Sequence, residues 1–161
     1  MAELIGLAIR PARKAPMETL NAVDVTADGG LAGDHAGKYP DRMVTILDEA
    51  AWHAALSDLE LPTERRDALD WTVRRANLLT RGAALPRAKG GIVQVGDVQF
   101  EVTGQTWPCK RMEEAQTGLL KALAKDWRGG VTCRVLVPGE IAVGDPVSIP
   151  VSPPEMVRRL P

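Results

Sequence analysis

The stretch IVQVGDVQFEVT, residues 92–103, gives the strongest indication of the fold. Apolar and polar residues alternate on both sides of the pair Gly96-Asp97, which predicts two β-strands, 92–95 and 98–103, joined by a tight hairpin. The pattern recurs as IAVGDPVSI at residues 141–149. One repeated pair falls short of the three repeats that a solenoid needs, so we interpret it as one turn pattern used twice in a barrel.

Short strands outnumber helices along the rest of the chain. Further strands are expected at residues 4–9, 22–26, 43–47, 77–80 and 132–137. Helices are expected at 49–59 behind the cap Asp48, at 64–73 behind Thr63 and at 118–127 behind Thr117. Together with 15 Gly and 12 Pro, this pattern indicates a mainly β (α+β) protein, a closed or partly closed β-barrel with helical insertions. We expect one domain over residues 1–150 and a C-terminal tail over 151–161.

Composition excludes several classes of protein. The 161 residues suit one domain, and the 45% hydrophobic and 25% charged fractions exclude a disordered or fibrous chain. A formal charge of -1 gives no general attraction to nucleic acid or to an anionic membrane. Two cysteines are too few for a secreted disulfide framework, and the first residues lack the charge pattern of a signal peptide. We therefore expect a cytoplasmic protein with reduced thiols.

The most unusual local sequence surrounds Cys109, in VTGQTWPCKRMEE at residues 102–114. Gly104 permits a turn after the expected strand, and Pro108 fixes the backbone before the thiol. Cys109 is thus expected on a stiff loop at a strand end, where reactive groups are common. If Cys109 opens a short helix through Ala115, free backbone N–H groups favour its thiolate. The alternative is an inert, half-buried cysteine.

Five segments resemble, in the same order, the MOSC domain family, which is named for the C-terminal part of molybdenum cofactor sulfurase. They are GLAGD at 30–34, RMVTIL at 42–47, RANL at 75–78, VTGQTWPC at 102–109, and GG at 129–130 followed by VLVPGEIAVGD at 135–145. The resemblance runs from about Leu4 to Ile149, and its Pro-Cys segment is the most diagnostic part. It implies a MOSC-type β-barrel.

The resemblance also implies a role in molybdenum-cofactor chemistry. Members of the family bind the molybdopterin form of the cofactor or carry sulfur for it. In the mitochondrial amidoxime-reducing branch, the equivalent cysteine ligates molybdenum and N-hydroxylated bases are reduced. Motif position gives Cys109 that catalytic and metal-ligating role. A soft thiolate suits a high-valent metal already held by a dithiolene, and coordination would deprotonate the sulfur.

The cofactor's phosphate and pterin edge need further partners. Phosphate favours Arg, Lys or clustered backbone N–H groups, and an Asn side chain both donates and accepts along a pterin edge. The candidate cofactor-binding residues are Arg42, Arg75, Asn77, Thr103, Arg111, Arg128, Gly129 and Gly130, with Arg74 considered beside them. The group at 128–130 is preferred among them because glycines let a backbone approach an anion closely. For each arginine the alternative is a solvated surface charge.

Other residues with chemical potential have several interpretations. The glycine-rich segment 29–37 lacks the Gly-Lys-Ser/Thr ending of a P-loop, and Asp34 in it is expected to hold a neighbouring loop by hydrogen bonds. For His35, proton transfer and a solvated loop position both stay open. Strand alternation makes Cys133 a buried structural thiol, and a disulfide with the other cysteine would need Cα atoms within ~7 Å. Trp107 either stacks on a pterin or lines its loop.

Three functions follow, and two of them need partners. A molybdenum-cofactor oxidoreductase that reduces N-hydroxylated or similar small molecules needs a separate electron-donor reductase, because the sequence has no flavin, haem or iron–sulfur motif. A sulfur carrier that holds a persulfide on Cys109 needs a cysteine desulfurase to load it. The third function is a non-catalytic binding barrel. Cofactor binding is common to the preferred interpretations, and we favour the oxidoreductase over sulfur transfer.

Overall fold

The hairpin over residues 92–103 forms as predicted. Strands β7 (Ile92–Val95) and β8 (Val98–Gln105) pair antiparallel, with Val95 opposite Val98. Gly96 makes the turn with φ +57°, a conformation that glycine adopts without a Cβ penalty and that matches the twist of the two strands.

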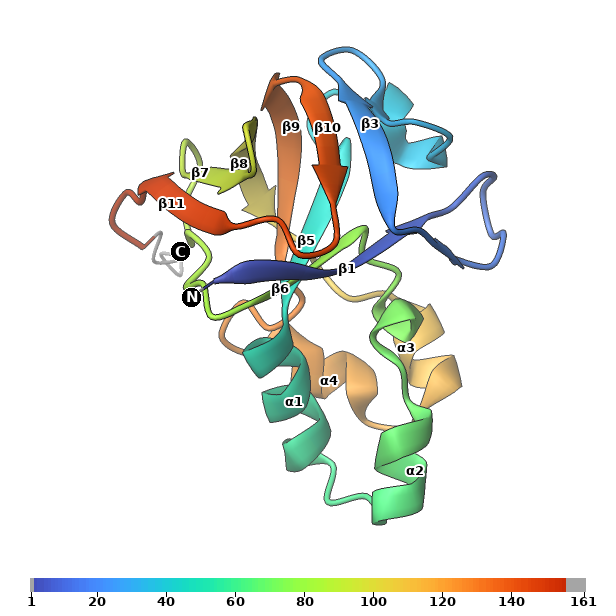
Figure 1. Ribbon diagram of the computed structural model, residues 1–161. Coiled ribbons are helices and arrows are strands. Elements are labelled where there is room, and N and C mark those ends of the chain that lie inside the picture. Colours follow the sequence, from blue (N-terminus) through green and yellow to red (C-terminus); the bar gives the residue numbers. More distant parts are fainter. Residues whose placement is uncertain (1, 156–161) are drawn as a thin grey trace, which may run out of the picture.

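The computed structural model describes residues 2–155, and in that range eight strands form the main sheet (Figure 1). Their order is β11 (Val147–Val151), β7, β8, β9 (Val131–Val137), β5 (Val44–Asp48), β6 (Leu78–Arg81), β1 (Glu3–Ile9) and β2 (Glu18–Thr19). A smaller sheet has the order β10 (Gly139–Ala142), β3 (Ala22–Thr26) and β4 (Gly30–Leu31). β5 and β6 run parallel, whereas the neighbouring pairs are antiparallel.

The second Gly-Asp pair does not form a hairpin. β10 pairs with β3 and β11 pairs with β7, so the strands on either side of Gly144-Asp145 belong to different sheets. The Asp145 carboxylate accepts a hydrogen bond from the Ala142 N–H at 2.9 Å. Two backbone hydrogen bonds join the turn to β1: the Leu4 N–H donates to the Asp145 carbonyl at 2.9 Å, and the Gly144 N–H donates to the Leu4 carbonyl at 2.7 Å. Other strand edges therefore take the hydrogen bonds that a hairpin would have used.

The large sheet with few helices is confirmed, but the closed barrel is not. The strand ladders form an open series from β11 to β2. One isolated bridge, between Glu3 and Pro146, joins the start of β1 to the segment before β11. The expected tail over 151–161 is reduced at its start, because Val151 still belongs to β11; residues 156–161 lie outside the described residues.

The helices lie together below the sheet in the view of Figure 1. They are α1 (Glu49–Asp58), α2 (Thr63–Ala68), α3 (Lys110–Ala115) and α4 (Leu119–Ala124), with a 3₁₀ turn, η2 (Trp71–Arg74), after α2. Asp48 caps α1 as predicted, accepting from the Ala50 N–H at 3.1 Å. Over the described residues, no helix is both long and apolar enough to cross a membrane.

Two of the predicted helices are shorter than expected. Pro62 rather than Thr63 precedes α2, which ends where Leu69 turns to extended dihedrals and buries its side chain. Asp70 then caps a separate turn, η2. Gly118 rather than Thr117 precedes α4, and the helix ends before Asp126 and Trp127 because both adopt positive φ.

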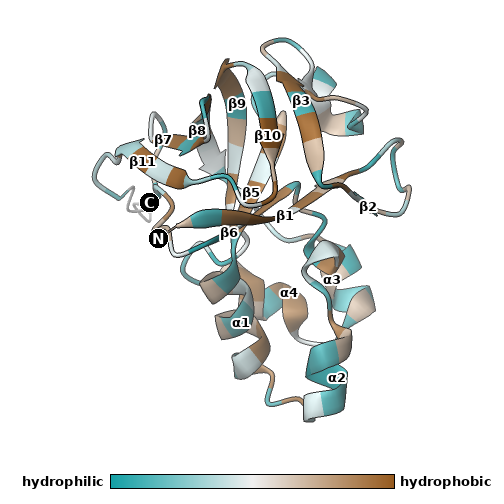
Figure 2. Cartoon of the chain, in the orientation of Figure 1, coloured by the Kyte–Doolittle hydropathy of each residue, from teal (hydrophilic) through white to brown (hydrophobic). Residues whose placement is uncertain are grey.

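Apolar side chains form one core on each face of the sheet. Figure 2 shows the hydrophobic residues of the strands and helices in brown. Strand alternation divides neighbouring residues between them. Ile46 and Leu78 pack into the core enclosed by strands, whereas Leu47 and Leu79 pack under the helices. Met112 of α3 belongs to the helical core, which anchors the first turn of α3.

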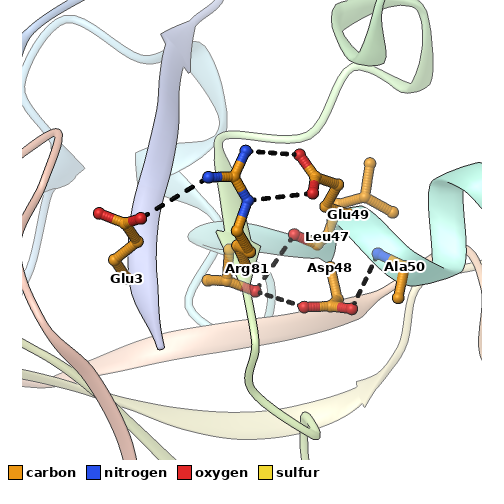
Figure 3. A network of polar contacts seen from close by, with 7 residues as sticks. Glu3, Leu47, Asp48, Glu49, Ala50 and Arg81 are labelled. Carbon is orange, nitrogen blue, oxygen red and sulfur yellow. Dashed lines mark hydrogen bonds and ion pairs between the residues drawn. The ribbon is translucent and has the colours of Figure 1, made fainter. Parts of the chain in front are cut away.

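Polar groups join the start of α1 to the sheet (Figure 3). Arg81 donates to both Glu49 oxygens at 3.1 and 3.2 Å and lies 3.7 Å from Glu3 of β1. Asp48 accepts a hydrogen bond from the Thr80 hydroxyl at 3.2 Å. Hydrogen bonding from Arg81 lowers the pKa of Glu49, whereas burial raises the pKa of Asp48. The network fixes α1 against β6 and β1.

Candidate functional site

A cleft of about 1120 Å³ opens beside Cys109. Its walls are the loop after β1, the segment before β5, the end of η2, neighbouring parts of β8 and β9, and the first turn of α3. The cleft therefore collects residues from most of the chain's length around one thiol.

Positive charge dominates the lining of this cleft. Of the described residues, the cations that line it are Arg10, Arg13, Lys14, Arg42, Arg74, Arg75, Lys89, Lys110, Arg111 and Arg134. The lining carboxylates are Asp41 and Glu101, and Glu101 already pairs with Arg134 at 2.6 Å. A chain with 20 Lys+Arg and 21 Asp+Glu thus builds a strongly cationic hollow, which attracts anions.

Cys109 is exposed at the entry to α3. It adopts extended dihedrals (φ -113°, ψ 172°), and the helix that it opens runs through Ala115 as the sequence predicted. Its Sγ lies 3.8 Å from Sδ of Met112, and its N–H lies 3.3 Å from the same sulfur. Because Met112 is held in the helical core, these contacts position the thiol at the edge of the cleft.

Arg74 is a buried cation that lines the same cleft as Cys109. Only 5% of its surface is exposed, and its Nε donates to the Gly129 carbonyl at 3.0 Å. Its Nη2 is buried and has no hydrogen-bond partner within residues 2–155. Burial lowers the pKa of Arg74 to about 10, and the charge of Cys109 acts in the opposite direction. Keeping this guanidinium charged costs on the order of 3 kcal/mol, at ~1.4 kcal/mol per pKa unit.

Arg75 and Arg10 add two more uncommitted donors. Arg75 sits in the left-handed region with φ +63°, and its Nη2 donates to the Ala15 carbonyl at 2.5 Å. Burial lowers the pKa of Arg75, and the charges of Arg10 and Arg111 lower it further. The Nε atoms of Arg75 and Arg10 are buried without a partner in the described part of the chain. Buried donors are normally satisfied, so these atoms point to an anionic ligand.

The glycine-rich segment holds Arg10 in place. Asp34 Oδ1 accepts a hydrogen bond from the Arg10 N–H at 2.8 Å, so Asp34 ties down a neighbouring loop as predicted. The backbone N–H of His35 donates to the Arg10 carbonyl at 2.7 Å. His35 itself does not line the cleft. Its contribution there is to clamp the Arg10 backbone.

Five predicted site residues come together in the cleft: Arg42, Arg75, Thr103, Cys109 and Arg111. The guanidinium of Arg42 stacks 4.8 Å from the centroid of the Tyr39 ring. The Thr103 hydroxyl lies 2.8 Å from the Thr132 hydroxyl and donates to the Asp41 carbonyl. The structure thus brings parts of three of the five segments, 42–47, 75–78 and 102–109, to one place.

Arg128, Gly129 and Gly130 do not line the cleft. Arg128 pairs with Asp58 at 2.6 Å and donates to the Ala122 carbonyl at 3.2 Å. A Cβ on Gly129 would lie 2.4 Å from the Thr106 carbonyl oxygen, and one on Gly130 would lie 2.1 Å from that of Ile46. These glycines allow backbone packing rather than approach of an anion, and Gly129 contributes by holding Arg74.

Asn77 also lies outside the cleft, with 4% of its surface exposed. Its Oδ1 accepts from the N–H and the hydroxyl of Thr45 at 3.0 and 3.1 Å, and its Nδ2 donates to the Ala8 carbonyl at 3.1 Å. The amide joins β1 to β5, and both its oxygen and its nitrogen already take part in hydrogen bonds. It has no free edge for a pterin.

The sequence analysis missed Arg10, Arg13, Lys14, Lys89, Lys110 and Arg134 as lining residues. A signal was present for the first three, which fall within five residues directly after a strand. Arg74, which the sequence analysis considered only beside the main candidates, is the most deeply buried cation of the cleft lining. Its burial depends on packing against Gly129, far away in sequence, and local patterns do not reveal such packing.

The two remaining ambiguous residues have distinct positions. Cys133 is fully buried in the strand-enclosed core, opposite Val44 and Val102, and burial raises the pKa of its thiol. Both cysteines are free. Trp107 lines the cleft with 58% of its surface exposed, so an aromatic face is open to a ligand.

Comparison with known proteins gives a family match and a shared fold. A family model described as the MOSC domain matches residues 33–148. The fold is similar to that of the YUAD protein from Bacillus subtilis, with a TM-score of 0.73 and 17% identity over 91% of this chain and 94% of that one. YiiM from Escherichia coli matches with a TM-score of 0.67 and 16% identity over 98% and 71% of the two chains. YiiM from Geobacillus stearothermophilus matches with a TM-score of 0.67 and 17% identity over 92% of this chain and 75% of that one. No curated protein matches the sequence.

Proposed function

The chain belongs to the MOSC domain family, and on that premise we propose that its cleft binds the molybdenum cofactor in the molybdopterin form. One observation carries the proposal: three arginines with a buried guanidinium nitrogen that has no partner in the described residues line the same cationic cleft as an exposed thiol. This donor set fits a ligand that combines a soft, sulfur-binding metal with an anionic group.

Cys109 is the proposed metal ligand. Its side chain is exposed at the cleft, and its backbone is fixed by Pro108 and by the contact with Met112. A thiolate is the form of cysteine that binds metals, and the buried cation Arg74 lines the same cleft as Cys109. The bound cofactor would supply two-electron redox chemistry at molybdenum.

Arg10, Arg74 and Arg75 are the proposed phosphate ligands. Each has a buried donor that no acceptor among the described residues satisfies, and a phosphate offers several strong acceptors at once. A charge-assisted hydrogen bond from each would offset the cost of burying that donor. Arg42 and Thr103 also line the cleft, and we assign them contacts with the remaining polar groups of the cofactor.

The proposed activity is reduction of N-hydroxylated or similar small molecules. Replacing N–OH by N–H consumes two electrons and two protons and releases water. A separate donor protein would deliver the electrons to the loaded site in the cytoplasm. The open cleft and the exposed Trp107 leave room for a flat substrate beside Cys109. The surrounding cations would hold anionic groups and order water for proton supply.

The alternative, a persulfide carrier, uses less of what the cleft contains. A carrier needs an exposed thiol, which Cys109 provides. It has no need of a nearly fully buried arginine with an unsatisfied Nη2. Because burying that charge costs stability, the arrangement favours permanent binding of an anionic cofactor over transient loading of sulfur.

Replacement of the metal ligand tests this function. The parent protein, Cys109→Ser and Arg128→Ala are purified from a host that makes the cofactor, and their molybdenum and pterin contents are measured. Cys109→Ser should lose the metal while its melting temperature stays close to that of the parent, because Cys109 is exposed. Arg128→Ala removes a cation outside the cleft and should keep both. Equal molybdenum in the parent and Cys109→Ser would reject the ligand role.

A further inference from the structure

A second hollow adjoins the cofactor cleft. It measures about 560 Å³ and lies between η2, α3 and the loop after β1. The two hollows share four lining residues, Lys14, Arg75, Lys110 and Arg111, so these side chains border both spaces. We call the second hollow the anion lobe.

The anion lobe is rich in cations that lack counter-ions. Among the described residues, its one lining carboxylate is Glu114. Within the described residues, none of its four cations takes part in an ion pair. Arg75 and Arg111 both line the lobe; burial lowers the pKa of Arg75, and the charges of Arg10 and Arg111 lower it further. Like charges that face each other without a counter-ion are unfavourable, and an anion between them removes the repulsion.

The phosphate of the cofactor alone leaves most of this positive charge uncompensated. Ten cations and two carboxylates line the main cleft among the described residues. One phosphate monoester contributes about -1.5 to -2 at neutral pH. A second anionic ligand is therefore expected. The anion lobe is a suitable place for it, because Lys110, the residue directly after Cys109, lines both this lobe and the cleft.

We propose that the anion lobe binds a phosphate or carboxylate group of the substrate, so that the protein prefers anionic substrates over neutral ones. This assignment of a substrate class rests on the proposed function of the cleft. A concave lobe of this volume suits a small anion, because a hollow can surround it with several donors. The lysines supply point charges and Arg111 supplies a planar fork, a combination that accepts either oxyanion.

Inorganic phosphate tests the lobe without any catalytic readout. The parent and the double variant Lys14→Ala/Lys110→Ala are titrated by calorimetry at low ionic strength. Both lysines are exposed, so the variant should fold normally. The parent should show a phosphate site whose Kd rises at least about tenfold in the variant, the effect of losing ~1.4 kcal/mol. The control Lys121→Ala/Lys125→Ala removes the same charge outside both hollows and should leave the Kd within about twofold.

A kinetic arm identifies the ligand as substrate. Molybdenum-loaded protein is assayed with benzamidoxime and with its para-carboxylated analogue, and the KM for the carboxylated compound is divided by the KM for the neutral one. This ratio should rise at least about tenfold in the lysine variant. An unchanged ratio, equal weakening of phosphate in the two double variants, or lysine-dependent binding of an acidic donor protein without an effect on phosphate would each overturn the proposal. A parent that lacks molybdenum yet keeps the lysine-dependent phosphate site would reject the cofactor assignment and leave the anion lobe intact.

Discussion

The two cysteines have the same side chain in opposite surroundings. Cys109 is exposed at the cleft, whereas Cys133 is fully buried and burial raises the pKa of its thiol. We therefore predict that, in the cofactor-free protein, Ellman's reagent modifies Cys109 within minutes and modifies Cys133 only after denaturation. Cys109→Ser should then lose the fast reaction and Cys133→Ser should keep it. Fast modification of Cys133 in the folded protein would contradict the structure.

Arg74 shows how a binding site can reduce the stability of the empty protein. Its guanidinium is buried with Nη2 unsatisfied by the described residues. Arg74→Met replaces this charge by an apolar chain of similar length, a change that is often neutral or stabilising. We predict a melting temperature equal to or above that of the cofactor-free parent, although one hydrogen bond to Gly129 is lost, together with loss of bound pterin. Scanning calorimetry and pterin fluorescence measure the two effects. A destabilised variant that keeps the pterin would refute this account of Arg74.

At this scale, sequence revealed the thiol but not its surroundings. The Pro-Cys segment predicted the position of Cys109 and the short helix after it. The buried donors of Arg10 and Arg74 depend on contacts with Asp34 and Gly129, which are 24 and 55 residues away in sequence. No local pattern distinguishes such an arginine from a solvated one. Arg128 shows the converse case, since the residue predicted at a glycine pair pairs with Asp58 and does not line the cleft.

At the scale of elements, Asp48 joins the start of α1 to β6. Burial raises the pKa of its carboxyl above 3.8, so the unfolded chain releases this proton more readily than the folded one. The contribution of Asp48 to stability therefore falls as the pH rises from 3.8 through the higher pKa of the folded protein. Asp48→Asn keeps an acceptor for Ala50 and Thr80, and its stability relative to the parent should increase between pH 3 and pH 7 in urea unfolding.

Glu49 provides the matched control for this pH dependence. Arg81 lowers the pKa of Glu49, so its contribution is present above about 4.5 and is lost as the pH falls. Glu49→Gln should therefore lose stability relative to the parent as the pH rises from 3 to 7, the opposite trend to Asp48→Asn. The same direction of change in both variants would contradict the network shown in Figure 3.

Local patterns predicted strands well and pairings less well. Residues 92–103 form the predicted hairpin, because the turn and both strands are adjacent in sequence. The same pattern at residues 141–149 splits between two sheets, because β3 and β7 offer edges to its strands. Competition between distant edges decides such a case. The prediction of a closed barrel also depended on which strands pair, and the strand order from β11 to β2 does not confirm closure.

At the scale of the whole molecule, the near-neutral charge conceals a strong separation. From its net charge of -1, the sequence predicts no general attraction to polyanions. The fold nevertheless concentrates cations from several loops around one cleft. A net charge does not reveal such an arrangement, because the separation exists only after folding. The consequence is selective attraction of small anions at one place.

Metal and pterin analysis of the unmodified protein, freshly purified from a cofactor-producing host, tests the central claim most directly. We predict molybdenum and pterin in equal molar amounts, both retained through gel filtration. Folded, fully reduced protein that carries neither molybdenum nor pterin would contradict the claim.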